Sequence, residues 1–273
     1  MIRFQYFEPA TLAEAVLILG RYKGSASVLA GGTDLLVEIK EHLRRAAQVV
    51  NIKRIPGMEM LSFDPRSGLR IGALVTARQI ELSSDVEKHY PGLLQAVREL
   101  GSIQVRNRAT VVGNICRASP SADTLPPLIA DGASLKTSRR TVLLEEFFTG
   151  PGKTVLAADE IVTAIEIPAP PAHTGKVYIK HGRRKAMELA TVGVAVRVSP
   201  NEVRIVLGAV APTPVRAKAA EAAFLRGNVE EAATAAMAEA QPITNVRASA
   251  DYRRKMVKVL TRRALERAME LAK

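Results

Sequence analysis

The sequence predicts an α+β protein with a larger N-terminal region and a small C-terminal unit. Three observations support this class: helix and strand patterns alternate over residues 11–52, a proline-rich segment interrupts the chain at 168–173, and three strand-like segments followed by helices lie beyond it. With 273 residues, of which 47% are hydrophobic and 24% charged, the chain can bury a substantial core, which excludes disordered and collagen-like proteins.

The first 55 residues predict alternating helices and strands. Thr11 and Glu14 have capping-box spacing ahead of an apolar run. The expected elements are a helix after Thr11, strands at 25–30 and 48–52, a turn at 31–34 and a helix at 35–40. This alternation predicts parallel strands joined by crossover helices.

The stretch from 56 to 172 predicts a second subdomain of short elements. The expected elements are strands at 69–73 and 161–167, short helices starting at Thr76 and Ser84, and a helix at 93–100. Residues 101–114 are polar and rich in arginine, and they are expected to form one long loop. A loop of this length inside a compact domain is usually functional.

The proline-rich segment at 168–173 favours a domain boundary. The predicted regions are therefore 1–172, with subdomains of about 1–55 and 56–172, and 173–273. Beyond the boundary we expect strands at 176–180, 190–198 and 203–209 and helices at 215–225, 230–238 and 248–271.

The net charge of +12 is concentrated in the last third of the chain. Residues 1–172 hold 20 basic and 18 acidic side chains, whereas residues 173–273 hold 19 and 9. Either an anionic partner or a solvated basic face accounts for such asymmetry. A nucleic-acid-binding protein remains an alternative, but it would need stacking aromatics, which make up only 4% of this chain.

The single cysteine and the lack of long apolar runs limit the other classes. One cysteine excludes an internal disulfide framework and a four-cysteine metal site, and it favours a cytoplasmic setting. No window reaches the roughly 18 apolar residues of a spanning helix, so we expect no membrane span. The four histidines lack metal-ligand spacing, and we expect no metal site and no catalytic dyad in this chain.

The first candidate site is the segment 28–36, in which two glycines stand between a strand and a helix. Glycines here permit positive φ and a close approach of an anion, and the free N–H groups of the helix start attract phosphate. Gly31, Gly32 and Thr33 would then hold a pyrophosphate. The alternative is a structural turn in which Asp34 caps the helix.

The second candidate site combines a glycine, an amide, hydroxyls and a carboxylate over residues 109–123. Buried polar groups of this kind need partners, which a polyhydroxylated ligand would supply. Asp123 could accept hydrogen bonds from ligand hydroxyls, or it could cap the helix that starts at Thr124. Cys116 lies beside Arg117, a cation that could lower the pKa of its thiol, although a lone cysteine is more often a packing residue.

Together, the segments 30–36 and 110–114 resemble the paired FAD-binding signatures of the medium subunit of molybdenum hydroxylases, the family of carbon monoxide dehydrogenase flavoproteins and the xanthine dehydrogenase flavin domain. Further matches lie at 147–150, 153–154, 159–161, 247–254 and 262–265, so the resemblance spans essentially the whole chain. It implies a two-subdomain FAD-binding region of the molybdopterin-dehydrogenase type, followed by a small α+β domain with a three-stranded sheet, with FAD in the crevice between them.

The resemblance also implies which residues contact FAD. The segments 28–35 and 110–114 would bind the diphosphate, and Asp123 would hold hydroxyl groups of the cofactor. Lys180 would lie near the flavin and stabilise its anionic reduced form. The alternative for Lys180 is a solvated lysine at the end of a strand. The full set of expected cofactor-binding residues is Val28, Leu29, Ala30, Gly31, Gly32, Thr33, Asp34, Leu35, Leu100, Ala109, Thr110, Val111, Val112, Gly113, Asn114, Cys116, Asp123, Val162 and Lys180. The second loop departs from the family pattern, because Val112 replaces the first glycine of the usual pair.

The function that the resemblance implies is electron transfer. A large partner subunit would oxidise the substrate at a molybdenum-pterin cofactor, and a small partner subunit would relay the electrons through [2Fe–2S] clusters. This chain would take the electrons from those clusters and pass them to an external acceptor. The expected assembly is a dimer of heterotrimers. The alternatives are a standalone flavin-dependent oxidase of related fold, or the basic nucleic-acid-binding protein considered above.

Overall fold

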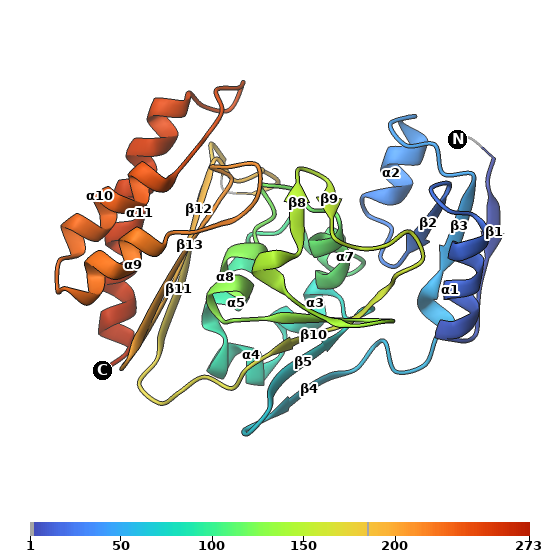
Figure 1. Ribbon diagram of the computed structural model, residues 1–273, viewed down its shortest axis with the longest axis horizontal. Helices are drawn as coiled ribbons and strands as arrows, with labels where there is room; N and C mark the ends of the chain where they lie inside the picture. Colours follow the sequence, from blue (N-terminus) through green and yellow to red (C-terminus); the bar gives the residue numbers. More distant parts are fainter. Residues whose placement is uncertain (1–2, 185) are drawn as a thin grey trace.

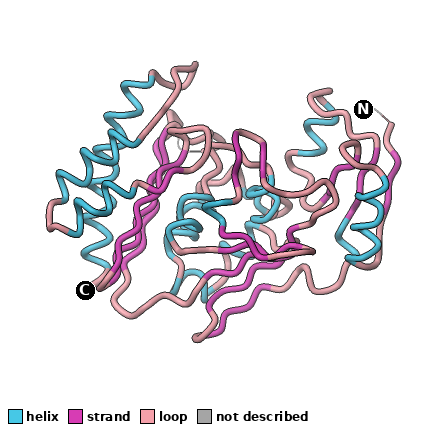
Figure 2. The backbone as a smooth tube through the Cα atoms, viewed as in Figure 1, coloured by secondary structure: helices cyan, strands magenta, loops and turns pink. Residues whose placement is uncertain are grey.

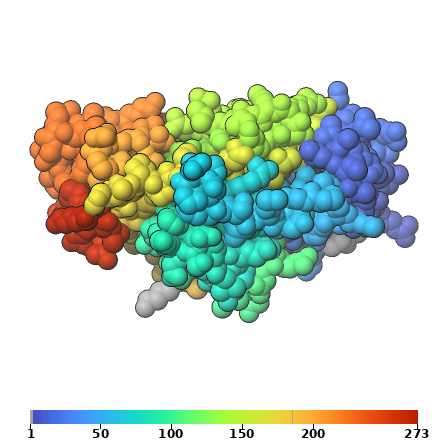
Figure 3. Space-filling view, turned by 90° about the horizontal axis from the view of Figure 1, so that it is seen from below, coloured from blue at the N-terminus to red at the C-terminus, as the bar shows by residue number. Residues whose placement is uncertain are grey.

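The computed structural model describes residues 3–184 and 186–273; Met1, Ile2 and Lys185 lie outside that description. Figure 1 shows three sheets that follow one another along the molecule, with the N-terminal sheet at one end and the C-terminal helices at the other. In the space-filling view of Figure 3 the three parts are in contact along this axis. The boundaries at 55/56 and 172/173 stay predictions.

The N-terminal sheet is parallel, as predicted. Its strands are β1 (Gln5–Phe7), β3 (Gln48–Asn51) and β2 (Ala26–Leu29), in that order, and they are accompanied by α1 (Leu12–Arg21), α2 (Leu35–Lys40) and the short helix η1 (Ile52–Arg54). The predicted cap of α1 is confirmed, because Thr11 Oγ1 accepts a hydrogen bond of 3.2 Å from the Glu14 N–H. β1 was not predicted, since its three residues are mostly exposed and carry no apolar alternation.

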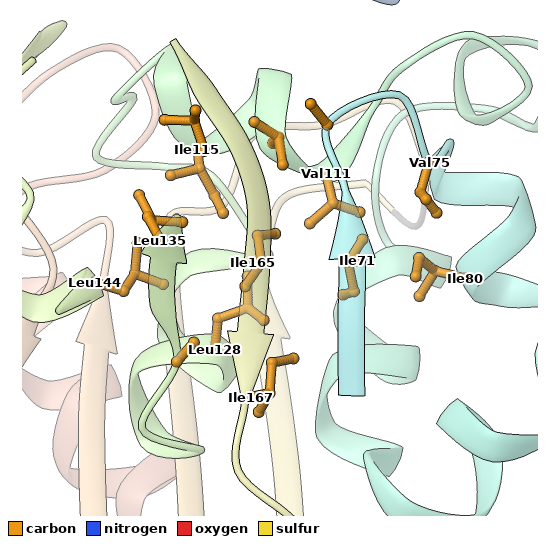
Figure 4. Close-up of a cluster of buried hydrophobic side chains, with 14 of the residues drawn as sticks. Ile71, Val75, Ile80, Val111, Ile115, Leu128, Leu135, Leu144, Ile165 and Ile167 are labelled. Carbon is orange, nitrogen blue, oxygen red and sulfur yellow. The ribbon is translucent and has the colours of Figure 1, made fainter. Parts of the chain in front are cut away.

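The central sheet has five antiparallel strands. They are β4 (Leu61–Asp64), β5 (Gly68–Gly72), β10 (Val162–Ile167), β6 (Ser134–Thr137) and β7 (Thr141–Leu143), in that order, and a separate hairpin joins β8 (Phe148–Gly150) to β9 (Lys153–Thr154). The predicted strands at 69–73 and 161–167 correspond to β5 and β10. Their side chains Ile71 and Ile165 meet in the buried cluster of Figure 4. The other strands are too short and polar to show a pattern.

Helices surround the central sheet. They are α3 (Ala77–Glu81), α4 (Ser84–His89), α5 (Pro91–Arg98), α6 (Ile103–Arg106), α7 (Val111–Cys116) and α8 (Leu125–Ala130), with a 3-10 helix η2 (Leu144–Glu146). The prediction of one long loop over 101–114 was wrong, because α6 and the start of α7 lie within it. The side chains of Ser102 and Thr110 cap these two helices, and so the polar residues there mark helix starts.

The C-terminal part contains the three predicted strands and one short addition. The sheet order is β11 (Gly175–His181), β12 (Val192–Ser199), β13 (Glu202–Gly208) and β14 (Val215–Arg216), and the helices are α9 (Lys218–Leu225), α10 (Val229–Glu239) and α11 (Ala250–Leu271). The helix predicted from residue 215 starts at 218, because Val215 pairs with Leu207 as a strand.

The C-terminal sheet lies between two groups of helices. α9 and α11 pack on its outer face, whereas α5 and α8 from the central part pack on its inner face, as Figure 2 shows. At this inner face Lys176 Nζ lies 2.8 Å from Asp131 Oδ1, and both side chains are almost fully buried. The sheet is therefore joined to the central part by a buried ion pair as well as by apolar packing. Among the described residues, no helix has the length and apolar character that crossing a bilayer requires.

Candidate cofactor site

A cavity of about 390 Å³ lies where the two glycine-containing segments meet. One wall comes from the turn between β2 and α2, the other from the segment 109–117 around α7, and the start of β10 closes the space between them. The volume falls within the range of ordinary small-molecule pockets. The lining combines apolar side chains with exposed main chain and a few charged groups.

Gly31 brings the two walls into direct contact. A Cβ atom on this residue would lie 2.1 Å from the carbonyl oxygen of Arg108, a distance that no side chain tolerates. The next residue, Gly32, has a φ of +79°, in the left-handed region that favours glycine. The paired glycines thus have separate physical roles: the first allows close approach of the second wall, and the other allows the turn into α2.

The turn after Gly32 presents main-chain donors to the cavity. Within the described chain, the N–H groups of Gly32, Thr33 and Asp34 donate to no protein acceptor, whereas the Leu36 N–H donates to the Gly32 carbonyl. Asp34 occupies the N-cap position of α2, as the structural alternative expects, but its carboxylate makes no hydrogen bond to the helix start. The free donors are therefore available to an anionic ligand.

The carboxyl group of Asp34 lines the same cavity. Burial raises its pKa, an effect that the nearby Arg117 opposes and Glu38 reinforces. The charge of Arg117, which lines the same cavity, partly offsets the negative charge of this carboxylate toward an anionic ligand.

The second wall is organised by Thr110. Its hydroxyl oxygen accepts a hydrogen bond of 3.0 Å from the Gly113 N–H, and a Cβ on Gly113 would lie 2.7 Å from that oxygen. The Asn114 side chain is oriented by Thr124, whose hydroxyl donates to Asn114 Oδ1 at 2.7 Å. Val112, which replaces the glycine of the family pattern, contributes its side chain to the lining.

Cys116 is not activated. Burial raises the pKa of its thiol to about 12, so the expectation that Arg117 could lower this pKa was wrong. The Arg117 guanidinium is paired with Glu38 instead. The thiol packs against the apolar core and serves as part of the cavity wall.

Most of the predicted residues meet at this cavity. Those that line it are Val28, Ala30, Gly31, Gly32, Thr33, Asp34, Leu35, Leu100, Ala109, Thr110, Val112, Gly113, Asn114, Cys116 and Val162. Leu29 and Val111 lie behind the walls: Leu29 belongs to a small core cluster with Ile39, and Val111 lies in the buried cluster of Figure 4. Their neighbours face the cavity because adjacent residues in a strand or a helix point in different directions.

Asp123 and Lys180 form a separate buried group with Tyr178. Lys180 Nζ donates to Asp123 Oδ2 and to the carbonyl oxygen of Glu99, both at 3.0 Å, and the Tyr178 hydroxyl donates to Asp123 Oδ1 at 2.8 Å. Burial raises the pKa of Asp123, although the charge and hydrogen bond of Lys180 oppose this effect. The group joins β11 to the segments before α6 and α8.

Two alternatives from the sequence are thereby removed. Asp123 does not cap α8, because the N-cap position is Thr124 and both Asp123 oxygens face β11. Lys180 is not a solvated lysine at a strand end, because its side chain is only 6% exposed. Leu100, which follows the Glu99 carbonyl, lines the cavity, so this group borders the cavity without lining it.

Several lining residues were missed by the sequence analysis. They are Glu38, Arg44, Ile52, Ala73, Gly101, Val105, Arg117, Leu156, Glu160 and Ile161. Glu38 pairs with Arg44 nearby in the sequence and with Arg117 far away from it. Glu160 accepts hydrogen bonds from the distant Thr137 and Arg140. The motif 159–161, noted for its family resemblance, gave a signal for Glu160 and Ile161, and the polar stretch 101–114 gave one for Gly101 and Val105.

The lining segment 100–105 is fixed by Arg106. This side chain is 9% exposed; it donates to Glu81 and to the carbonyl oxygens of Arg98 and Leu100. Burial acts to raise the pKa of Glu81, but hydrogen bonds from Arg78 and Arg106 outweigh it and hold the pKa below its ordinary value of 4.5.

This lowered pKa predicts a loss of stability in acid. The Glu81 contribution is fully present above pH 4.5 and is lost as the pH falls through the lower pKa of the folded state. We expect Glu81→Gln to be destabilised at pH 7 by about 1–3 kcal/mol, and the difference from the wild type to shrink as the pH falls below 4.5. Urea unfolding at a series of pH values measures this; a difference that stays constant across the series would contradict it.

The fold and the cavity together define a class of cofactor-binding oxidoreductase subunit. The sequence pattern described as the FAD-binding domain in molybdopterin dehydrogenase matches residues 2–170, and that of the carbon monoxide dehydrogenase flavoprotein C-terminal domain matches residues 177–268. The chain belongs to the family of FAD-binding medium subunits of carbon monoxide and xanthine dehydrogenases. The family resemblance and the fold class predicted from the sequence are confirmed.

Individual relatives match over nearly their whole length. The chain is 32% identical to the xanthine dehydrogenase FAD-binding subunit of Escherichia coli O157:H7, over 98% of this chain and 96% of the relative. It is 35% identical to the carbon monoxide dehydrogenase medium chain of Hydrogenophaga pseudoflava, over 97% of each. A solved structure of carbon monoxide dehydrogenase from H. pseudoflava superimposes with a TM-score of 0.94, at 34% identity and 99% coverage of both chains.

Proposed function

We propose that this chain is the electron-transfer subunit of a multi-subunit molybdenum hydroxylase and that it holds FAD in the cavity between the two glycine loops. Electrons arrive from iron–sulfur clusters of a small partner subunit and leave for an external acceptor. The observation that carries the proposal is the set of free main-chain donors at residues 32–34 beside a cavity of about 390 Å³. Bound FAD supplies the redox chemistry, since a flavin exchanges electrons one or two at a time.

The residues present fit a dinucleotide with a diphosphate. The N–H groups of Gly32 and Thr33 would hold the phosphate oxygens, and Gly113 with Thr110 would form the facing wall. Apolar side chains such as Val28 and Leu100 line other parts of the cavity. Lys180, which the family resemblance places near the flavin, would favour a reduced, anionic cofactor. Its Nζ donates to Asp123 and to the Glu99 carbonyl, directly before the lining residue Leu100.

The assembly is proposed on the same basis. The partners would be an iron–sulfur subunit and a subunit with a molybdenum-pterin cofactor, arranged as a dimer of heterotrimers in the cytoplasm. The support is the near-complete match to medium chains of carbon monoxide dehydrogenases and to a xanthine dehydrogenase subunit. Substrate oxidation would then take place on another polypeptide, and this chain would need no catalytic base for it.

The nucleic-acid-binding alternative loses support from α11. Its basic side chains are largely paired with acidic neighbours, for example Arg254 with Asp251 and Lys258 with Glu230. Binding to a phosphate backbone depends on lysine and arginine charges that neutralise phosphates, and the acidic partners of these side chains reduce that attraction. The remaining positive surface is proposed to assist docking of acidic partners. Arg253 is excluded from that surface, because it is only 2% exposed.

A co-purification experiment tests the assembly. An affinity tag on this chain, expressed from its native operon, should recover two further subunits together with FAD, iron and molybdenum. Reduction of the flavin by the substrate of the complex should require those subunits. Recovery of a single flavoprotein that is reduced directly by a small molecule would instead establish the standalone oxidase.

A further inference from the structure

Glu38 holds two arginines with its two carboxylate oxygens. Oε1 lies 2.7 Å from Arg117 Nη2, and Oε2 lies 3.0 Å from Arg44 Nε. The Glu38 side chain is 14% exposed, whereas Arg44 and Arg117 are 47% and 40% exposed. All three residues line the cavity. We call this group, Glu38 with Arg44 and Arg117, the Glu38 bridge.

The Glu38 bridge joins the two walls of the cavity. Glu38 belongs to α2, which follows the first glycine segment, whereas Arg117 is the residue directly after α7, the helix that contains the second glycine segment. The walls come from different sheets: α2 accompanies the parallel N-terminal sheet, and α7 packs against β10 of the central sheet. An ion pair between them therefore resists their separation.

Both carboxylate oxygens of Glu38 are paired with side chains of the protein. Each oxygen of Glu38 faces a different guanidinium, so two positive charges offset the negative charge that would otherwise repel an anionic ligand. The group carries one positive charge in sum, which is compatible with a diphosphate nearby. Because the Glu38 oxygens bind arginines on both sides, we infer that this group connects the two walls and does not hold the ligand itself.

We propose that the Glu38 bridge is a positioning device that keeps the cavity closed and slows the release of FAD. This inference rests on the proposed function, since it requires FAD in this cavity. Release requires the walls to part, and the pair Glu38–Arg117 has to break when they do. The ion pair between Glu38 and Arg117 thus slows the loss of the cofactor, and neither residue contacts the reacting atoms.

The test is the rate of FAD release from the purified protein, followed by flavin fluorescence after dilution. Glu38→Gln and Arg117→Gln should each release FAD about fivefold faster, which corresponds to ~1 kcal/mol for a partly exposed ion pair. The double variant should be no faster than either single variant, because both remove the same interaction. Arg117→Lys should restore much of the slow release. Added salt should speed release from the wild type and have little effect on the glutamine variants.

Glu166→Gln is the matched control. It removes an arginine–glutamate pair of similar length, Arg70–Glu166 at 2.8 Å, with side chains 41% and 38% exposed. The pair lies on the central sheet and outside the cavity lining, so this variant should leave release unchanged. Slower release from Glu38→Gln with faster release from Arg117→Gln would show that Arg117 contacts FAD directly and would overturn the inference. Unchanged rates in both variants would overturn it too. A wild-type protein that retains no FAD would overturn the proposed function, and the role of the bridge with it.

Discussion

Replacing Gly32 with aspartate is expected to abolish retention of FAD. The φ of +79° strains any other residue, a Cβ here would lie 3.0 Å from side-chain carbons of Leu29 and Leu36, and the new carboxylate would stand among the main-chain donors of the turn. Strain of about 1–2 kcal/mol adds to charge repulsion against the diphosphate. We expect FAD content, measured by flavin absorbance of the purified protein, to fall more than about tenfold.

Gly24→Asp provides a matched control. Gly24 has the same φ of +79°, but open space surrounds the position of its missing Cβ, and it lies outside the cavity lining. This variant carries the same backbone strain and the same added charge, so it should keep its FAD. Gly113→Asp should lose FAD as Gly32→Asp does, because its side chain would collide with Thr110. Normal FAD content in both cavity variants would show that the glycine loops do not hold the cofactor.

Breaking the buried pair of Lys176 and Asp131 is expected to give the largest loss of stability. The two side chains are 5% and 4% exposed, and Lys176 Nζ also lies 4.2 Å from the centre of the Tyr90 ring. Lys176→Met leaves a buried carboxylate without its cation, which costs about 3–5 kcal/mol. Urea unfolding should show this loss as a lower midpoint at unchanged slope.

The paired variant separates charge from packing. Lys176→Met combined with Asp131→Leu removes both charges and replaces them with apolar groups of similar size, which is often neutral or stabilising. We therefore expect the double variant to recover most of the stability lost by the single one. A double variant as unstable as Lys176→Met would show that the loss comes from altered packing between the C-terminal sheet and α8.

The glycine loops could be predicted because their chemistry is local. A pair of glycines between a strand and a helix can be recognised without knowing any distant contact. The parallel strands beside it follow from the alternation of helix and strand patterns along the chain. By contrast, the role of Asp34 was open until the structure showed a free carboxylate, because capping depends on a side-chain torsion that the sequence does not reveal. The helices α6 and α7, of four and six residues, are too short to show a helical period in the sequence, although Ser102 and Thr110 are ordinary cap residues.

Contacts between distant segments could not be predicted. The bridge from Glu38 to Arg117 joins helix α2 to the end of helix α7. The partners of Asp123 lie on β11, beyond the proline-rich segment. Charged residues of this kind are abundant in the sequence, and no spacing rule selects these from the others. The family resemblance indicated Asp123 and Lys180 as site residues, but only the structure shows that they bind each other.

A structure of the FAD-loaded protein is the most direct test of the central claim that the two glycine loops hold the cofactor. We expect the diphosphate to lie against the main-chain N–H groups of Gly32 and Thr33, with the segment 110–114 on its other side, inside the cavity of about 390 Å³. FAD bound elsewhere on the chain, with this cavity left empty, would contradict the account.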